Sequence, residues 1–198
     1  MNRPKASLLL TILLPIVSAG FLLVSASRAA TETPEYKVVR TDEKFEIRDY
    51  PELTIATTPM KDGGMNGGFG QLFRFITGNN EGSEKIEMTA PVLIDTAKDK
   101  KTMSFIIPKK AVEKGVPKPQ GDAVKLSKVA PARYAVLRFE GGHTAETEKG
   151  AVEKLTAWLD AQKIAPKGEA IFAYYDSPET PVTLRRNEVM IRIEKVGE

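Results

Sequence analysis

The sequence contains no cysteine and only one histidine, His143, among its 198 residues. Without cysteine the chain forms no disulfide, no thiolate metal site and no lipid-modified N-terminal cysteine. With one histidine it has no histidine metal cluster, and a serine–histidine–aspartate triad would have His143 as its sole base. A chain of this length can fold on its hydrophobic core alone, so the lack of cysteine does not argue against export.

An excess of charge of either sign is also missing once the first thirty residues are set aside. The whole chain has 29 lysines and arginines against 26 acidic residues. Residues 1–30 contain Arg3, Lys5 and Arg28 and no acid, which leaves 29 − 3 = 26 basic residues against 26 acidic ones. A near-neutral protein has no general attraction for nucleic acid or anionic lipid, so we predict no nucleic-acid partner.

The first thirty residues have the layout of a secretory signal peptide. Arg3 and Lys5 precede the uncharged apolar run 8–24, and small residues follow, with Ala26 and Ala29 as alternative cleavage positions. The other interpretation is an uncleaved N-terminal membrane anchor, although the run is slightly shorter than the roughly 20 apolar residues that span a bilayer. We therefore expect an exported, periplasmic protein, or one anchored in the membrane and facing the periplasm, with residues 31–198 forming a single domain.

From residue 36 onward the same order of elements occurs twice, in pseudo-repeats at about 36–108 and 123–196. Each half reads β-β-α-β-β, and the strands alternate apolar and polar residues, as in Val189, Ile191 and Ile193 against Glu188 and Arg192. This alternation is typical of antiparallel sheets with one buried face. The pattern predicts an α+β fold: a distorted antiparallel β-barrel built from the two halves, with two helices packed on it.

The two helices are predicted near 69–77 and 145–162. The second has an apolar stripe at three- and four-residue spacing, and Thr144 is its expected N-cap. The stretch "GGMNGGFGQLF" before the first helix does not match a dinucleotide-binding loop or a P-loop. We interpret it as a mobile loop that lets the backbone approach a neighbour closely. Residues 109–122 are predicted to be a linker between the halves.

Single residues give weaker indications of chemistry. His143 follows two glycines just before the second helix. A turn or capping role is the simpler interpretation, and a role as metal ligand or base is the alternative. Tyr175 ends a predicted strand, at the rim of the domain. Arg186 and Asn187 are expected to tie strand ends together, since guanidinium groups commonly do so. No matched nucleophile and base occurs in the sequence, so we predict a non-catalytic protein.

Four blocks of the sequence belong together: "YKVVRTDEKFEIRDYP", "FGQLFRFITGNN" running into "IEMTAPV", "FIIPKK…VPKPQGD" and "YYDSPETPVTLRRNEVMIRI". Together these blocks resemble the SOUL haem-binding protein family, over essentially all of residues 36–196. The resemblance implies a duplicated, distorted barrel with two helices. It also implies binding of haem or another tetrapyrrole in an open hydrophobic cleft beside the first helix.

Carried over residue by residue, the resemblance implies a site on and around that helix. The aromatic residues would form the floor of the cleft, a basic residue would meet the propionates, and other residues would form the rim. The implied residues are Phe69, Phe73 and Phe75 for the floor, Arg74 for the propionates, and Met65, Asn66 and Tyr175 for the rim.

The sequence departs from the family at two places. Asp49 stands where one branch of the family has a histidine proposed as axial ligand, and residues 179–184 contain no basic residue. Any haem would therefore be held weakly and reversibly, with His143 or a loop methionine as the candidate axial ligand. Two other functions remain open: a binding module for another hydrophobic small molecule, since the fold also resembles bacterial effector-binding domains, or a hydrolase acting on such a molecule.

Overall fold

The computed structural model describes residues 31–60, 64–97 and 101–195, in which nine strands and three α-helices form. The expected leader, residues 1–30, lies outside the described residues. Within them, none of the helices has the length and apolar character needed to cross a membrane. The strands are β1 (Lys37–Asp42), β2 (Phe45–Tyr50), β3 (Leu53–Pro59), β4 (Val92–Asp95), β5 (Thr102–Ile106), β6 (Lys125–Val129), β7 (Ala132–Phe139), β8 (Pro166–Tyr174) and β9 (Asn187–Ile193). The helices are α2 (Gly64–Ile76), α3 (Lys109–Lys114) and α4 (Ala145–Ala161), with a 3₁₀ turn, η1, at Val182–Leu184.

The nine strands form one antiparallel sheet in the order β1-β2-β7-β9-β8-β4-β5-β3-β6. Strands β2, β3, β4 and β5 with α2 have the β-β-α-β-β order, and β6, β7, β8 and β9 with α4 repeat it. Counted outward from the central β8–β4 pair, β8, β9, β7 and β2 on one side correspond to β4, β5, β3 and β6 on the other. The predicted α+β class is thus confirmed, with β1 and α3 as additions. The sheet ends at β1 and β6 and does not close, so the barrel is not confirmed.

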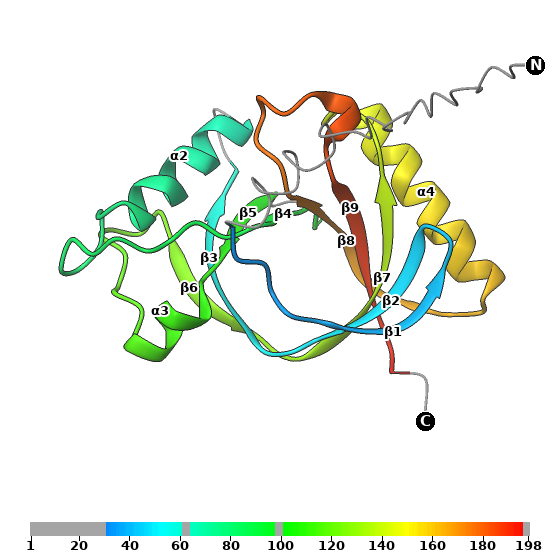
Figure 1. The fold of residues 1–198 in the computed structure, drawn as a ribbon, viewed down its shortest axis with the longest axis horizontal. Helices are drawn as coiled ribbons and strands as arrows, with labels where there is room; N and C mark the ends of the chain where they lie inside the picture. The colour runs from blue at the N-terminus through cyan, green and yellow to red at the C-terminus, as the bar shows by residue number, and fades with distance from the viewer. Residues whose placement is uncertain (1–30, 61–63, 98–100, 196–198) are drawn as a thin grey trace, which may run out of the picture. The chain divides into compact units, whose positions relative to one another are not determined.

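The sheet curves strongly where the chain bends at a proline between two consecutive strands. This happens between β2 and β3 and between β6 and β7. Two residues, including Pro51, separate β2 from β3, and two residues, including Pro131, separate β6 from β7. Tyr50 pairs with Ala132 before the bend and Leu53 pairs with Val129 after it. Because proline cannot donate a hydrogen bond to a neighbouring strand, the ladder is interrupted there. The strands run on in a new direction, and the sheet curls round an interior (Figure 1).

The curled sheet has an outer face, covered by α2 and α4, and an inner face. Helix α2 contacts β3 and β5, and α4 contacts β7 and β9 (Figure 1). Each helix buries one apolar stripe, which is Leu72, Phe75 and Ile76 on α2 and Ala151, Leu155 and Leu159 on α4. These side chains join outward-facing strand residues in the main core, while a smaller cluster with Tyr50, Tyr134 and Met190 lies on the inner face.

The structure corrects the interpretation of the glycine-rich stretch as a loop. Residues 64–68 belong to α2, which begins five residues earlier than predicted. The sequence misleads here because glycine disfavours helices, and tertiary packing overrides that preference. A Cβ built on the buried Gly68 would lie 3.5 Å from the Cβ of Met103 and from the Cγ of Met60. The helix therefore lies close to β5 at this point, with room for a methyl group but not for a large side chain.

Of two other predicted segments, one differs from its prediction and one agrees with it. Residues 109–122 were predicted to be a linker, but Lys109–Lys114 form α3. The second helix agrees closely with its prediction, and Thr144 caps it by accepting a hydrogen bond from the backbone nitrogen of Thr147 at 3.2 Å.

Candidate functional site

Helix α2 exposes a strip of three large apolar side chains. Met65, Phe69 and Phe73 follow one another at four-residue spacing, so they lie on one face of the helix. Phe69 and Phe73 are 40% and 46% exposed, and their rings stack with centroids 5.8 Å apart and planes within 15°. The ring of Phe69 also meets Phe105 of β5 edge-on at 5.4 Å, which fixes its position against the core. We call Met65, Phe69 and Phe73 the aromatic strip.

The polar residues predicted for this site flank the strip. Asn66 is exposed in the first turn of α2, and Arg74 is exposed in its last turn. Phe75, by contrast, is only 1% exposed and belongs to the main core. The prediction that it forms the floor of a cleft is corrected: Phe75 is on the stripe of α2 that faces the sheet.

Tyr175 is on the other side of the sheet from the strip. Alternation along β8 directs Tyr174 into the outer core, and Tyr175, the next residue, turns to the inner face. The Tyr175 hydroxyl donates to Glu188 at 3.0 Å, and the guanidinium of Arg186 lies 3.8 Å from its ring centroid. Burial, followed by the charge of Glu188, raises the pKa of Tyr175. The predicted site residues therefore do not form one constellation.

His143 lies beside the N-terminal end of α4, where its ring centroid is 3.7 Å from that of Tyr174. Its Nε2 atom is buried and has no hydrogen-bond partner among the described residues. Burial is the main cause that lowers the pKa of His143, so the imidazole is neutral at pH 7 and keeps a lone pair for a metal. The described residues contain no cluster of three or more histidine, cysteine or acidic side chains placed to hold a metal ion.

The loop between β8 and β9 is held by its arginines. Arg185 donates to the carbonyl oxygens of Thr180 at 2.8 Å and Pro178 at 2.6 Å. The side-chain amide of Asn187 donates to the carbonyl oxygen of Gly141 at 2.9 Å, which ties β9 to the segment before α4. The Asn187 bond agrees with the predicted tying of strand ends, whereas the Arg186 side chain binds Glu188, two residues further along the chain. Val182 and Leu184 are exposed on the same loop.

A buried ionic network on the inner face was not predicted from the sequence. Arg48 of β2 binds Glu188 of β9 through two hydrogen bonds, 2.7 and 3.1 Å long, and Arg186 binds the same carboxylate at 2.7 Å. Burial alone would lower the pKa of Arg48 and raise that of Glu188. Their mutual hydrogen bonds and charges outweigh it, so the pKa of Arg48 is raised and that of Glu188 is lowered. Because 140 residues separate the partners, no local pattern indicates this pair.

The chain thus combines a curled antiparallel sheet, two helices on its outer face and an exposed aromatic strip on one of them. The family model for the SOUL heme-binding protein matches residues 31–192. The chain therefore belongs to the SOUL family, as its motifs indicated. No curated protein sequence matches it.

Solved structures share the fold at low sequence identity. The C-terminal domain of EcmrR matches with a TM-score of 0.55 at 11% identity, over 81% of this chain and 99% of that domain. An uncharacterized conserved protein from Listeria innocua matches with a TM-score of 0.54 at 12% identity, over 88% of this chain and 98% of its own. A hydrolase from Listeria innocua matches with a TM-score of 0.52 at 13% identity, over 79% and 94%. At such identities these similarities concern the fold alone.

Proposed function

We propose that this protein binds haem or a related tetrapyrrole on the aromatic strip of α2 and carries it without catalysing a reaction. Membership of the SOUL family supports the ligand class. The observation that carries the proposal is the near-parallel pair of Phe69 and Phe73 rings, held in place by Phe105 and left open on the outside. Exposed aromatic rings in register are a surface that a flat apolar ring would cover.

The dimensions of the strip suit a macrocycle. With a rise of about 1.5 Å per residue, the eight steps from Met65 to Phe73 extend about 12 Å along the helix. An apolar ring laid over them would bury both phenylalanines, and Arg74 is placed next to Phe73 to pair with a propionate. Asn66 is at the other end, where it can hydrogen-bond a polar substituent.

The axial ligand would be weak or absent. Met65 belongs to the strip itself, so its thioether can reach an iron bound there, whereas His143 packs against Tyr174 beside the N-terminal end of α4 with its Nε2 atom buried. His143 is held beside α4 by Asn187 and by the ring of Tyr174, and these contacts do not present it to the strip. We therefore expect weak, reversible binding, which suits a carrier or buffer. The leader-like residues 1–30 support carriage outside the cytoplasm.

Titration of the full chain with haem, followed in the Soret band, tests this proposal. Replacing both Phe69 and Phe73 by aspartate should weaken binding by about tenfold or more, since each buried phenylalanine contributes about 1.5–3 kcal/mol. Val112→Asp removes an exposed apolar residue from α3 and serves as the control. Unchanged haem affinity in the double variant would refute the site.

The location and the axial ligand need separate measurements. Mass analysis of the protein purified from its own host should give a chain starting after Ala26 or Ala29 if the leader is removed. The Soret position of Met65→Leu, compared with that of His143→Ala, would show which side chain reaches the iron. An intact N-terminus in the purified protein would favour the membrane-anchored alternative.

A further inference from the structure

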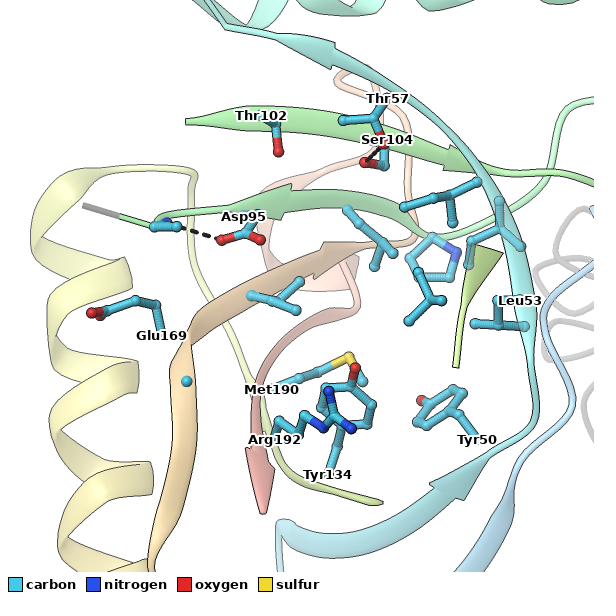
Figure 2. Close-up of a pocket in the computed structure, with 18 of the residues that line it drawn as sticks. Tyr50, Leu53, Thr57, Asp95, Thr102, Ser104, Tyr134, Glu169, Met190 and Arg192 are labelled. Carbon is cyan, nitrogen blue, oxygen red and sulfur yellow. Dashed lines mark hydrogen bonds between the residues drawn. The ribbon is translucent and has the colours of Figure 1, made fainter. Parts of the chain in front are cut away.

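The inner face of the sheet holds a cavity of about 410 Å³ that none of the predicted site residues lines. Strands β3, β4, β5, β8 and β9 surround it, and their side chains point into it (Figure 2). Alternation separates it from the aromatic strip: Phe105 of β5 packs against Phe69 outside, while the adjacent Ser104 faces the cavity. The cavity is thus a second place for a ligand, and it does not depend on the haem proposal.

The walls of the cavity are mostly apolar. Leu53, Ile55, Leu93 and Ile171 are half-buried around it, and the buried Met190 also lines it. Three polar side chains, Thr57, Thr102 and Ser104, lie on the β3 and β5 walls, and the hydroxyl groups of Thr57 and Ser104 bond each other at 2.7 Å. Filling this space with an apolar body would remove these side chains from water, and a volume of this size is typical of small-molecule sites.

Two phenol rings form one end of the cavity. Tyr50 and Tyr134 meet edge to face with centroids 5.7 Å apart, and Figure 2 shows both rings directed into the space. Arg48 donates to the Tyr50 hydroxyl at 3.3 Å, which holds that ring in place. Ring faces fixed in this way attract an aromatic group or a cation.

The charged residues around the cavity are Asp95, Lys167, Glu169 and Arg192. The ammonium of Lys167 pairs with Glu194, outside the cavity. Asp95 points into the space in Figure 2, and only one of its oxygens accepts a hydrogen bond within the described residues, from the Ala97 nitrogen at 2.9 Å. With Lys167 neutralised, two carboxylates face one guanidinium.

The position of Asp95 makes it the dominant charge. Its carboxylate is half-buried beside the apolar walls, whereas Arg192 and Glu169 are exposed and are therefore screened by water and salt. We propose that this cavity binds a monovalent organic cation with an apolar or aromatic body. The body lies against the wall formed by Leu93 and Ile171, its ring packs against Tyr50 and Tyr134, and its ammonium pairs with Asp95.

A matched pair of probes tests the sign of the charge. 4-Phenylbutylamine and 4-phenylbutanoate have similar bodies and opposite charges at pH 7, and their binding to the full chain can be compared by calorimetry. The amine should bind more tightly. Asp95→Asn should weaken the amine by about fivefold or more, the loss of one charge-assisted contact. Glu153→Gln, on the exposed side of α4, is the control and should leave binding unchanged.

A second variant tests the place. Ile171→Trp fills the cavity and should abolish amine binding, and Leu93→Phe, a smaller change, should weaken it if the tryptophan variant does not fold. Tighter binding of the anion, or amine binding that neither variant affects, would overturn the proposal. Haem titration of the same variants separates the two proposals: Ile171→Trp should leave haem binding intact, and Phe69→Asp with Phe73→Asp should leave amine binding intact.

Discussion

The guanidinium of Arg48 and the carboxylate of Glu188 form a two-bond ion pair across the inner face of the sheet, with nitrogen–oxygen distances of 2.7 and 3.1 Å. Both side chains are almost completely buried. The pair joins β2 to β9 directly, although β7 lies between these strands in the sheet. Arg48 also lies over the ring of Tyr36 at 4.4 Å, so the segment before β1 is tied to the same point.

Removing one partner of this pair should destabilise the fold strongly. Arg48→Met leaves Glu188 buried with only Arg186 and Tyr175 as partners, and we expect the free energy of unfolding to fall by about 3 kcal/mol or more. Lys128→Met removes one partner of the exposed Lys128–Glu52 pair and should cost about 1 kcal/mol or less. Urea unfolding of both variants checks this. Equal losses would mean that the inner network contributes no more than a surface pair.

The same network predicts how stability depends on pH. Burial tends to raise the pKa of Glu188, but its arginine partners lower it below its ordinary value. A carboxyl group with a lowered pKa in the folded state stabilises the protein above its unfolded pKa, about 4.3, and this contribution is lost as the pH falls further. Asp49, whose pKa is lowered mainly by its hydrogen bonds to Arg133, acts in the same direction.

Wild-type stability should therefore decline as the pH falls below about 4.3, and Glu188→Gln should be less stable at pH 7 but decline less steeply. Urea unfolding at pH 7, 5, 4 and 3 measures both slopes. Asp49→Asn should show a separate, smaller flattening, because that pair is partly exposed. If Glu188→Gln has the same slope as the wild type, its carboxyl is not the group that titrates.

The order of strands and helices could be predicted from the sequence because it depends on local periodicity. Alternation in strands such as 187–193 and the three- and four-residue stripe of α4 each follow from one buried face. The closure of the sheet could not be predicted, since it depends on how far β2–β3 and β6–β7 bend at Pro51 and Pro131. The start of α2 was missed because packing of Gly68 against Met103 outweighs poor helix propensity.

The site could be predicted only in part, because local periodicity is visible in the sequence whereas tertiary packing is not. The four-residue spacing of Phe69 and Phe73 places them on one face of a helix, and their exposure follows once the other stripe is buried. Phe75 was assigned to the wrong side because aromatic composition does not tell which stripe faces the sheet. The cavity and the Arg48–Glu188 pair were missed, because both depend on contacts between residues far apart in the sequence.

Truncation of Phe75 should mainly reduce stability, whereas truncation of Phe73 should mainly reduce haem binding. Phe75→Ala opens a cavity in the main core and should lower the free energy of unfolding by about 3–5 kcal/mol. Phe73→Ala removes a half-exposed ring and should cost less than about 1 kcal/mol of stability while weakening haem binding. Thermal unfolding and haem titration of both variants separate core from surface. A large loss of stability in Phe73→Ala would show that its ring belongs to the core.

Helix α2 should gain stability when Gly68 is replaced by alanine. The new Cβ would lie 3.5 Å from Met103 and Met60, an ordinary contact distance. Alanine in a helix is favoured over glycine by about 0.5–1 kcal/mol. For a chain of this size that corresponds to a rise in melting temperature of about 1–4 °C. Gly70→Ala, whose nearest neighbour would be the Arg74 guanidinium at 3.8 Å, should give a similar gain without touching the sheet.

Gly68→Leu should instead lower the melting temperature, because the larger side chain would force the helix away from β5. A rise for Gly68→Leu as well would show that the helix does not need the close approach.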